Sequence, residues 1–254
     1  MEKRLKNKYP SVSRMDNAEH VGIVKEIFST ITARYDLLNH VLSLGVDTLW
    51  RRFTVKKMRF FKTFRLLDVA TGTGDLAIYA AKTYPRITVT GLDFTGNMLE
   101  TGKTKISRKG LGKNITLVQG DAMSLPFPDN TFDVVSIAFG IRNIPDRKAS
   151  VNEMIRVLVP GGRLMVLEMT FARRSFFSRM TRFYLNRILP CIAGKITTNP
   201  GAYHYLADSI MNFPAPAEFA GFLEGLGLKE VVVHPFTFGV TYLYSGLKPV
   251  NGTP

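Results

Sequence analysis

The chain has 254 residues, of which 45% are hydrophobic, and it carries a formal net charge of +14. Its length suits a single doubly wound core with accessory helices, and no run reaches the roughly 18 apolar residues that a membrane span requires. The single cysteine excludes a disulfide within the chain and favours a reducing cytoplasm, while the positive charge favours an anionic partner, either nucleic acid or a membrane surface.

The first quarter of the chain is basic. Residues 1–20 are polar and basic, and we expect them to form a flexible segment ahead of helices within residues 21–64. Residues 51–65 then combine seven cations with four phenylalanines and contain no acid. This pattern is typical of a helix at a lipid headgroup surface, but it also fits an RNA-binding helix or a packed helix with a solvated face.

A glycine-rich turn follows the first predicted strand, at residues 65–70. A helix comes after the turn, and an acid ends the second strand. Such a turn lets a ligand approach the backbone, and an acid about 20 residues later can hold a ribose diol. We therefore predict a nucleoside-containing cofactor, bound by Asp68, Gly72, Thr73, Gly74 and Asp93.

Asp75 distinguishes between two classes of cofactor. The spacing Gly72-x-Gly74-x-x-Ala77 also fits a dinucleotide fingerprint. A carboxylate at the start of the helix would repel a pyrophosphate, whereas it suits the ammonium and sulfonium groups of S-adenosylmethionine. The alternative is that Asp75 only complements the helix dipole. We favour S-adenosylmethionine.

Three further strands are predicted at residues 115–122, 132–139 and 163–168. The first of them ends in Asp121 and Ala122, where an adenine ring is expected to lie. Strands that alternate with helices imply a parallel sheet covered by helices on both faces, and ligands bind at the carboxyl ends of such strands.

The end of the chain departs from this alternation. A second basic and aromatic stretch at residues 173–187 is followed by a predicted helix at 217–226 and by strands at 228–235 and 240–247. The predicted fold class is therefore α/β, a doubly wound, mostly parallel seven-stranded sheet with a C-terminal antiparallel hairpin. It looks like the class I S-adenosylmethionine-dependent methyltransferase fold, as a single domain over residues 21–254.

Four motifs carry a resemblance to a known family: residues 35–43 followed by Trp50, residues 139–143, residues 156–168 and residues 203–214. Together they resemble the ubiquinone/menaquinone biosynthesis C-methyltransferase family, and the likeness runs from Asn17 to Pro249. Leu38, Asp47 and Val159 stand where that family usually has Met, His and Lys. We expect Asp47 to act instead as the N-cap of the basic helix that follows it.

The resemblance implies methyl transfer from S-adenosylmethionine to a ring carbon of a polyprenylated quinol, most directly from demethylmenaquinol to menaquinol. We place Arg142 and Asn143 beside the ring oxygen, with Arg142 as an electrostatic stabiliser because arginine stays protonated. We expect Tyr35, Asn39 and Tyr203 to bind the substrate, the last as part of an inserted helical cap over residues 171–214. Asp36, His40 and His204 are candidates for the base, and none is preferred.

A prenyl tail implies that the protein attaches peripherally to an anionic membrane, at its inner face, and nucleic acid is not favoured as a partner. No cluster of ligands with metal-site spacing occurs, so no metal is expected. The alternatives are an RNA or other small-molecule methyltransferase and a non-catalytic scaffold in a quinone-making complex. The motifs do not decide between a naphthoquinol and a benzoquinol, or the prenyl length or the oligomeric state, for which a homodimer is one candidate.

Overall fold

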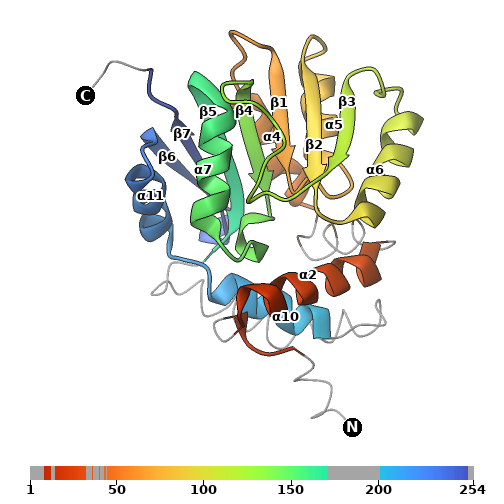
Figure 1. The fold of residues 1–254 in the computed structure, drawn as a ribbon, viewed down its shortest axis with the longest axis vertical. Coiled ribbons are helices and arrows are strands. Elements are labelled where there is room, and N and C mark those ends of the chain that lie inside the picture. Colours follow the sequence, from red (N-terminus) through yellow and green to blue (C-terminus); the bar gives the residue numbers. More distant parts are fainter. Residues whose placement is uncertain are drawn as a thin grey trace.

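A computed structural model describes residues 9–12, 15–32, 36, 40, 43, 45–170 and 201–250 of the chain. Figure 1 shows a twisted sheet with helices on both of its faces. The strands are β1 (Arg65–Val69), β2 (Thr88–Asp93), β3 (Ile115–Gln119), β4 (Phe132–Ala138), β5 (Leu158–Met169), β6 (Lys229–Phe236) and β7 (Thr241–Leu247).

The strands lie in the order β3-β2-β1-β4-β5-β7-β6. β1 to β5 are parallel, and β7 runs antiparallel between β5 and β6. The strand order reverses between β1 and β4, which is where open α/β sheets bind ligands. The sheet therefore has the predicted topology, including the C-terminal antiparallel hairpin.

β5 begins five residues earlier than the predicted strand at 163–168. Leu158 pairs with Phe132 of β4, and the chain then bends at Gly161, whose φ is 78°. The N–H of Gly161 donates to the carbonyl of Lys248 at 2.9 Å, which keeps the bend inside the sheet. A Pro-Gly-Gly sequence that indicates a turn is therefore an irregular part of a strand.

Two helical layers cover the sheet. The helices on one face are α4 (Asp47–Lys56), α5 (Asp75–Thr83) and α6 (Gly96–Arg108), and those on the other are α7 (Arg147–Val157) and α11 (Pro216–Gly225). Successive strand residues alternate between the layers: Leu66 packs with the first group and Leu67 with the second, and both are fully buried. Burial on both faces explains why the central strands β1 and β4 are mostly apolar.

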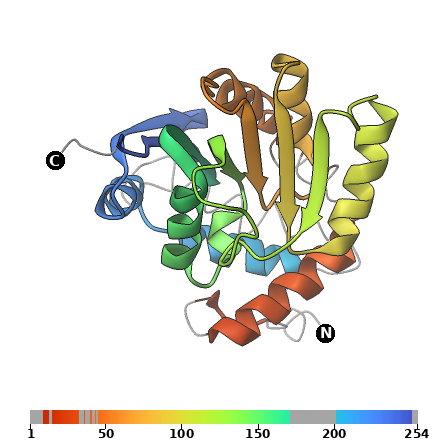
Figure 2. The ribbon, with the colours of Figure 1, turned by 45° about the horizontal axis from the view of Figure 1, so that its top comes forward.

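Two more helices, α2 (Asn17–Ile31) and α10 (Gly201–Met211), lie beyond the carboxyl ends of the parallel strands. In Figure 2 the arrowheads of β1 and β2 point toward these helices. Ile27 of α2 and Ile210 of α10 are buried in one small apolar cluster. In the part of the chain that the structure describes, no helix is long and apolar enough to cross a bilayer.

α2 begins at Asn17, inside the stretch that the sequence predicts to be flexible up to residue 20. Asp16 caps this helix by accepting a hydrogen bond from the N–H of Glu19 at 2.8 Å. Ahead of it, Ser11 donates to the carboxylate of Asp208 on α10. The cap at Asp16 and the contact between Ser11 and Asp208, 197 residues apart, order this part of the chain. The polar composition on which the prediction of flexibility rests does not reveal either interaction.

The basic segment at residues 51–65 does not form one surface helix, because α4 ends at Lys56. Phe53 and Phe60 pack against other rings, whereas Phe61 and Phe64 are 53% and 46% exposed. The carboxylate of Asp133 accepts hydrogen bonds from the four backbone N–H groups of residues 61–64. This fixes the segment at the amino edge of β4. The second basic segment, residues 173–187, and Cys191 lie outside the described residues.

Candidate functional site

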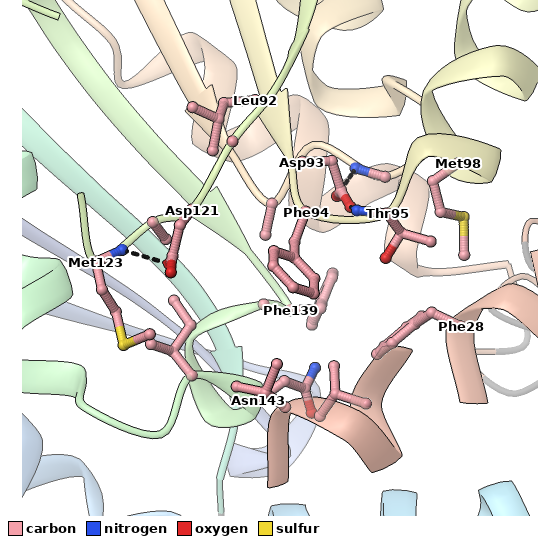
Figure 3. Close-up of a pocket in the computed structure, with 18 of the residues that line it drawn as sticks. Phe28, Leu92, Asp93, Phe94, Thr95, Met98, Asp121, Met123, Phe139 and Asn143 are labelled. Carbon is pink, nitrogen blue, oxygen red and sulfur yellow. Dashed lines mark hydrogen bonds between the residues drawn. The ribbon is translucent and has the colours of Figure 1, made fainter. Parts of the chain in front are cut away.

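A pocket lies at the carboxyl edge of the sheet, where the ends of β1, β2 and β4 meet α2. Its apolar wall includes the rings of Phe28, Phe94 and Phe139, and its polar groups include Asp93, Asp121 and Asn143. Figure 3 shows these side chains around one open space, with α2 closing the side opposite the strands. The position agrees with the ligand-binding edge expected of a doubly wound sheet.

Asp93 joins the glycine-rich turn to the start of α6. Its carboxylate accepts hydrogen bonds from the N–H groups of Gly72 and Thr95, each at 2.8 Å. Burial raises the pKa of Asp93, and these N–H groups oppose that effect. A carboxylate has about four lone-pair directions, so two backbone donors leave capacity for the hydroxyl groups of a ribose.

Asp68 lies fully buried behind the turn. Its carboxylate accepts hydrogen bonds from the hydroxyls of Thr71, at 2.7 Å, and Ser136, at 2.8 Å. Burial raises the pKa of Asp68 to about 6, against the lowering effect of the two hydroxyls and of Arg51. Asp68 therefore holds the turn from behind and places a titratable charge next to the pocket rather than in its wall.

The backbone is strained at the two strand ends that form the pocket. Ala70 after β1 and Phe139 after β4 have φ values of 50° and 60°, and both line the pocket. A Cβ on Gly140 would lie 2.6 Å from the Cβ of Ala70, so only glycine fits there. Non-glycine residues in the left-handed region cost free energy and are often found at functional sites, so the strain here agrees with the position of the pocket.

Two of the predicted residues come from the loop after β3. Asp121 and Ala122 both line the pocket, and Asp121 accepts a hydrogen bond from the N–H of Met123 at 2.8 Å. With Gly72 and Asp93, four of the seven predicted cofactor residues are in the wall. Thr73 and Gly74 lie in the same turn but are not part of that wall.

Asp75 is paired with a cation instead of facing the pocket. Its carboxylate lies 2.6 Å from Nζ of Lys105 on α6, and the same Nζ lies 2.6 Å from Asp36. Thr73 completes this cluster by donating to Asp36 at 2.6 Å. Lys105 is not among the predicted residues, although Met98, Gly102 and Lys105 follow one another at helical spacing along α6.

Arg142 and Asn143 belong to a short 3-10 helix, η3 (Ile141–Asn143), just beyond β4. Asn143 lines the pocket, whereas the buried guanidinium of Arg142 pairs with the fully buried Glu168. Glu168 also accepts the N–H of Arg142 at 3.3 Å, so the end of β5 holds η3 in place. The catalytic roles of Arg142 and Asn143 remain predictions.

Three predicted substrate residues are not placed by the structure. Tyr35 and Asn39 lie outside the described residues. Tyr203 lies in α10, and its side chain is not described. The sequence did not predict the contribution of α2 to the pocket wall, which comes from Val21, Val24 and Phe28, or that of Phe94 and Met98.

The N-cap predicted for Asp47 was wrong. Asp47 is the first residue of α4, and Val46 holds the cap position without a side-chain hydrogen bond. The carboxylate of Asp47 accepts from Ser43 at 2.8 Å, lies 3.2 Å from Nδ1 of His40 and lies 3.7 Å from Nε of Arg51. Among the candidate bases, His40 therefore contacts Asp47, and Asp36 pairs with Lys105. Neither His40 nor Asp36 is part of the pocket wall.

Among the described residues, no three His, Cys, Asp or Glu side chains come together in a way that could hold a metal ion.

Comparison with known proteins supports the methyltransferase interpretation. The pattern of the ubiE/COQ5 methyltransferase family matches residues 14–248. The ubiquinone/menaquinone biosynthesis C-methyltransferase UbiE of Geotalea daltonii is 43% identical over 226 residues, which is 89% of this chain and 96% of the relative. The demethylmenaquinone methyltransferase of Deinococcus radiodurans is 40% identical over 242 residues, which is 95% of this chain and 98% of the relative.

Solved structures confirm the class I methyltransferase fold. A SAM-dependent methyltransferase from Aquifex aeolicus has a TM-score of 0.56 at 19% identity and covers 78% of this chain and 88% of that one. The [4+2]-cyclase SpnF has a TM-score of 0.62 at 18% identity and covers 90% of this chain and 96% of that one. Since these identities are low and the second protein is named as a cyclase, the likeness speaks for the fold alone.

Proposed function

Because the chain belongs to the ubiE/COQ5 methyltransferase family, we propose that it methylates a ring carbon of a polyprenylated quinol, with demethylmenaquinol as the favoured substrate. The chain is an S-adenosylmethionine-dependent methyltransferase, and relatives that match nine-tenths of it carry out C-methylation in quinone biosynthesis. One observation supports the proposal most directly: the pocket joins the glycine turn and Asp93 to an aromatic wall.

The pocket residues fit the parts of S-adenosylmethionine. We assign the ribose hydroxyls to Asp93, the adenine to the loop at Asp121 and Ala122, and the amino acid end to the turn at Gly72. The ammonium group of that end suits the buried carboxylate of Asp68, which lies behind the turn. A pyrophosphate at the same turn would lie next to the Asp68 carboxylate, which disfavours a dinucleotide there.

When bound, S-adenosylmethionine would supply an electrophilic methyl group to a ring carbon whose neighbouring hydroxyl has lost its proton. S-adenosylhomocysteine would leave as the S–CH3 bond breaks, and the ring carbon would then release its hydrogen as a proton. The chain has to hold the ring flat against the cofactor and stabilise the negative oxygen. The rings of Phe28, Phe94 and Phe139 line the pocket and suit the first task. Asn143 suits the second because its amide can donate a hydrogen bond, and the ion pair of Arg142 with Glu168 holds the short helix that carries it.

The decisive experiment is methyl transfer from labelled S-adenosylmethionine to chemically reduced demethylmenaquinol in detergent. A reduced methoxy-polyprenyl-benzoquinol is assayed in parallel. Label in the naphthoquinol confirms the proposal, and label only in the benzoquinol assigns the chain to the other quinone. Absence of label from both rings, with the cofactor shown to bind, contradicts it.

Two rival functions have less support. An RNA methyltransferase would explain the net charge of +14, but the pocket is lined by three phenylalanine rings and is closed on one side by α2. Salt-sensitive incorporation of label into RNA would favour it. A non-catalytic scaffold would not need the strained junction at Ala70 and Phe139.

Asp68 predicts that cofactor binding depends on pH. Its pKa is about 6, so the carboxyl group is partly protonated in mildly acidic solution. A bound cation favours the ionised form, and binding below pH 6 must therefore release a proton. We expect the dissociation constant for S-adenosylmethionine to increase by up to about tenfold for each pH unit below about 6 and to level off above that range. Isothermal titration calorimetry at a series of pH values measures this.

Asp68→Asn provides the comparison. The variant keeps an oxygen that can accept from Thr71 or Ser136 but has no charge to titrate. It should therefore bind S-adenosylmethionine more weakly, with a dissociation constant that does not change with pH. Asp129→Asn, at the opposite edge of the sheet, should keep the wild-type profile. If the dissociation constant of Asp68→Asn for S-adenosylmethionine still depended on pH as in wild type, the pH dependence would belong to another group.

We also propose that the quinol enters from an anionic membrane and that the protein attaches there peripherally, at the inner face. The pocket lies at the carboxyl edge of the sheet, which is also the edge where β5 ends, at Met169. In the sequence, the basic segment at residues 173–187 follows the end of β5. The exposed Phe61 and Phe64 lie at the amino edge, away from the pocket.

The homodimer stays a prediction.

This orientation predicts which cations bind the membrane. Each cation near an anionic surface contributes about 1 kcal/mol, so Arg179→Ser with Arg182→Ser should weaken binding to phosphatidylglycerol vesicles roughly thirtyfold at low salt. Lys62→Ser with Arg65→Ser removes two exposed cations from the amino edge and should have little effect. Vesicle sedimentation measures both variants, and an equal loss in the two would contradict the orientation.

A further inference from the structure

A buried line of hydrogen-bonding side chains connects α2 to the pocket through α10. Nε2 of His20 lies 2.8 Å from the hydroxyl oxygen of Tyr205, and this hydroxyl donates to Oδ1 of Asn143 at 3.2 Å. His20 and Tyr205 are each 5% exposed and Asn143 is 9% exposed. Only Asn143 is in the pocket wall, so the other two can act on a ligand only through it.

The direction of these hydrogen bonds follows from counting protons. Tyr205 has one hydroxyl hydrogen, which it gives to Asn143, and burial raises the pKa of Tyr205, so the hydrogen is retained. Nε2 of His20 must then donate to the tyrosine oxygen. Burial and Arg147 lower the pKa of His20, which makes the donor a neutral imidazole with its hydrogen on Nε2.

This arrangement decides which end of the Asn143 amide faces the pocket. Oδ1 is occupied by Tyr205, so the group left for a ligand is Nδ2, which carries two hydrogens. Figure 3 shows the amide nitrogen on the side of the open space, toward Phe139, and the oxygen on the far side. A flipped amide would present an oxygen instead and would repel a negatively charged ligand atom.

We propose that His20 and Tyr205 are positioning residues, which hold the amide of Asn143 so that Nδ2 donates to the substrate oxygen beside the methylated carbon. The inference rests on the proposed function, since it assumes a ring oxygen that becomes negative. A donor fixed in advance stabilises such an oxygen without reorganisation during the reaction. A freely rotating amide would lose part of that effect.

Tyr205→Phe tests the inference, because it removes the hydroxyl and keeps the ring. We expect kcat to fall about ten- to a hundredfold, with the dissociation constant for S-adenosylmethionine within about twofold of wild type. The matched control is Tyr84→Phe. The hydroxyl of Tyr84 donates to the carbonyls of Val55 and Met58, near the opposite edge of the sheet, so kcat should not change.

A double-mutant cycle separates positioning from packing. If Tyr205 acts through Asn143, then Tyr205→Phe should add almost nothing to the loss already seen in Asn143→Ala. Additive losses, or an unchanged kcat in Tyr205→Phe, would overturn the inference. Should Tyr205→Phe not fold, His20→Gln and His20→Met take its place, because glutamine can still donate to the hydroxyl and methionine cannot. Equal activity of those two variants would also overturn it.

The wild-type protein separates this inference from the proposed function. Wild-type protein that transfers no methyl group to either quinol removes the function and the inference together. Wild-type protein that is active, with Tyr205→Phe equally active, removes the inference alone.

Discussion

Replacing Glu168 with alanine is expected to lower the free energy of unfolding by about 3–5 kcal/mol, because it leaves a buried guanidinium without its counter-charge. Glu168 is fully buried, and Arg142, its partner, is 6% exposed. The carboxylate also accepts the N–H of Met169 at 2.8 Å and attracts the half-buried Arg147. Urea unfolding, with linear extrapolation to water, measures the loss.

Two further variants test the cause. Glu168→Gln keeps the shape and one acceptor oxygen, so its loss should fall between those of wild type and alanine. Glu100→Ala breaks an exposed pair with Lys103, in which the side chains are 70% and 56% exposed, and should change the free energy of unfolding by about 0.5 kcal/mol or less. If Glu168→Ala were as mild as Glu100→Ala, the ion pair would not be the main contribution of this residue.

The second large effect concerns the cofactor. We expect Asp93→Asn to weaken binding of S-adenosylmethionine about ten- to a hundredfold, since a hydrogen bond to a charged group contributes about 1.5–3 kcal/mol. The carboxylate already accepts from Gly72 and Thr95, and an amide has only one oxygen with which to replace it. Isothermal titration calorimetry at about pH 8 measures the affinity with the carboxyl groups ionised.

Loss of the ribose contact has to be separated from disturbance of the turn. An S-adenosylhomocysteine analogue without ribose hydroxyls should bind wild type and Asp93→Asn with similar affinity. The natural S-adenosylhomocysteine should distinguish them. If the analogue also bound Asp93→Asn a hundredfold more weakly than wild type, Asp93 would act by holding Gly72 in place rather than by binding the ribose.

The sheet could be predicted from sequence because its rules are local. An apolar strand, a turn and a helix recur, and the antiparallel end follows from two strands with a short connection. The start of β5 could not be predicted in this way. Gly161 stays in the sheet through Lys248, 87 residues further along, and that pairing exists only once β7 lies beside β5.

The residues of the site differ in the same way: some are placed by local sequence and others by contacts distant in the sequence. Gly72, Asp93 and Asp121 follow strand ends directly, so their place at the pocket comes from the topology. Lys105 could not be predicted as the partner of Asp75, because that contact depends on how α6 packs beside the turn. The link between Asn143 and Tyr205 likewise spans 62 residues and depends on where α10 lies.

The position of β7 between β5 and β6 has a consequence for synthesis. A nascent chain leaves the ribosome from its amino terminus, so the strand that joins these two neighbours emerges last. Until then β5 has an open edge, and β6 has no strand to pair with. The sheet is therefore completed only after β7 has been translated, and a ribosome that stalls before residue 241 would hold a protein whose cofactor edge is built but whose sheet is still open.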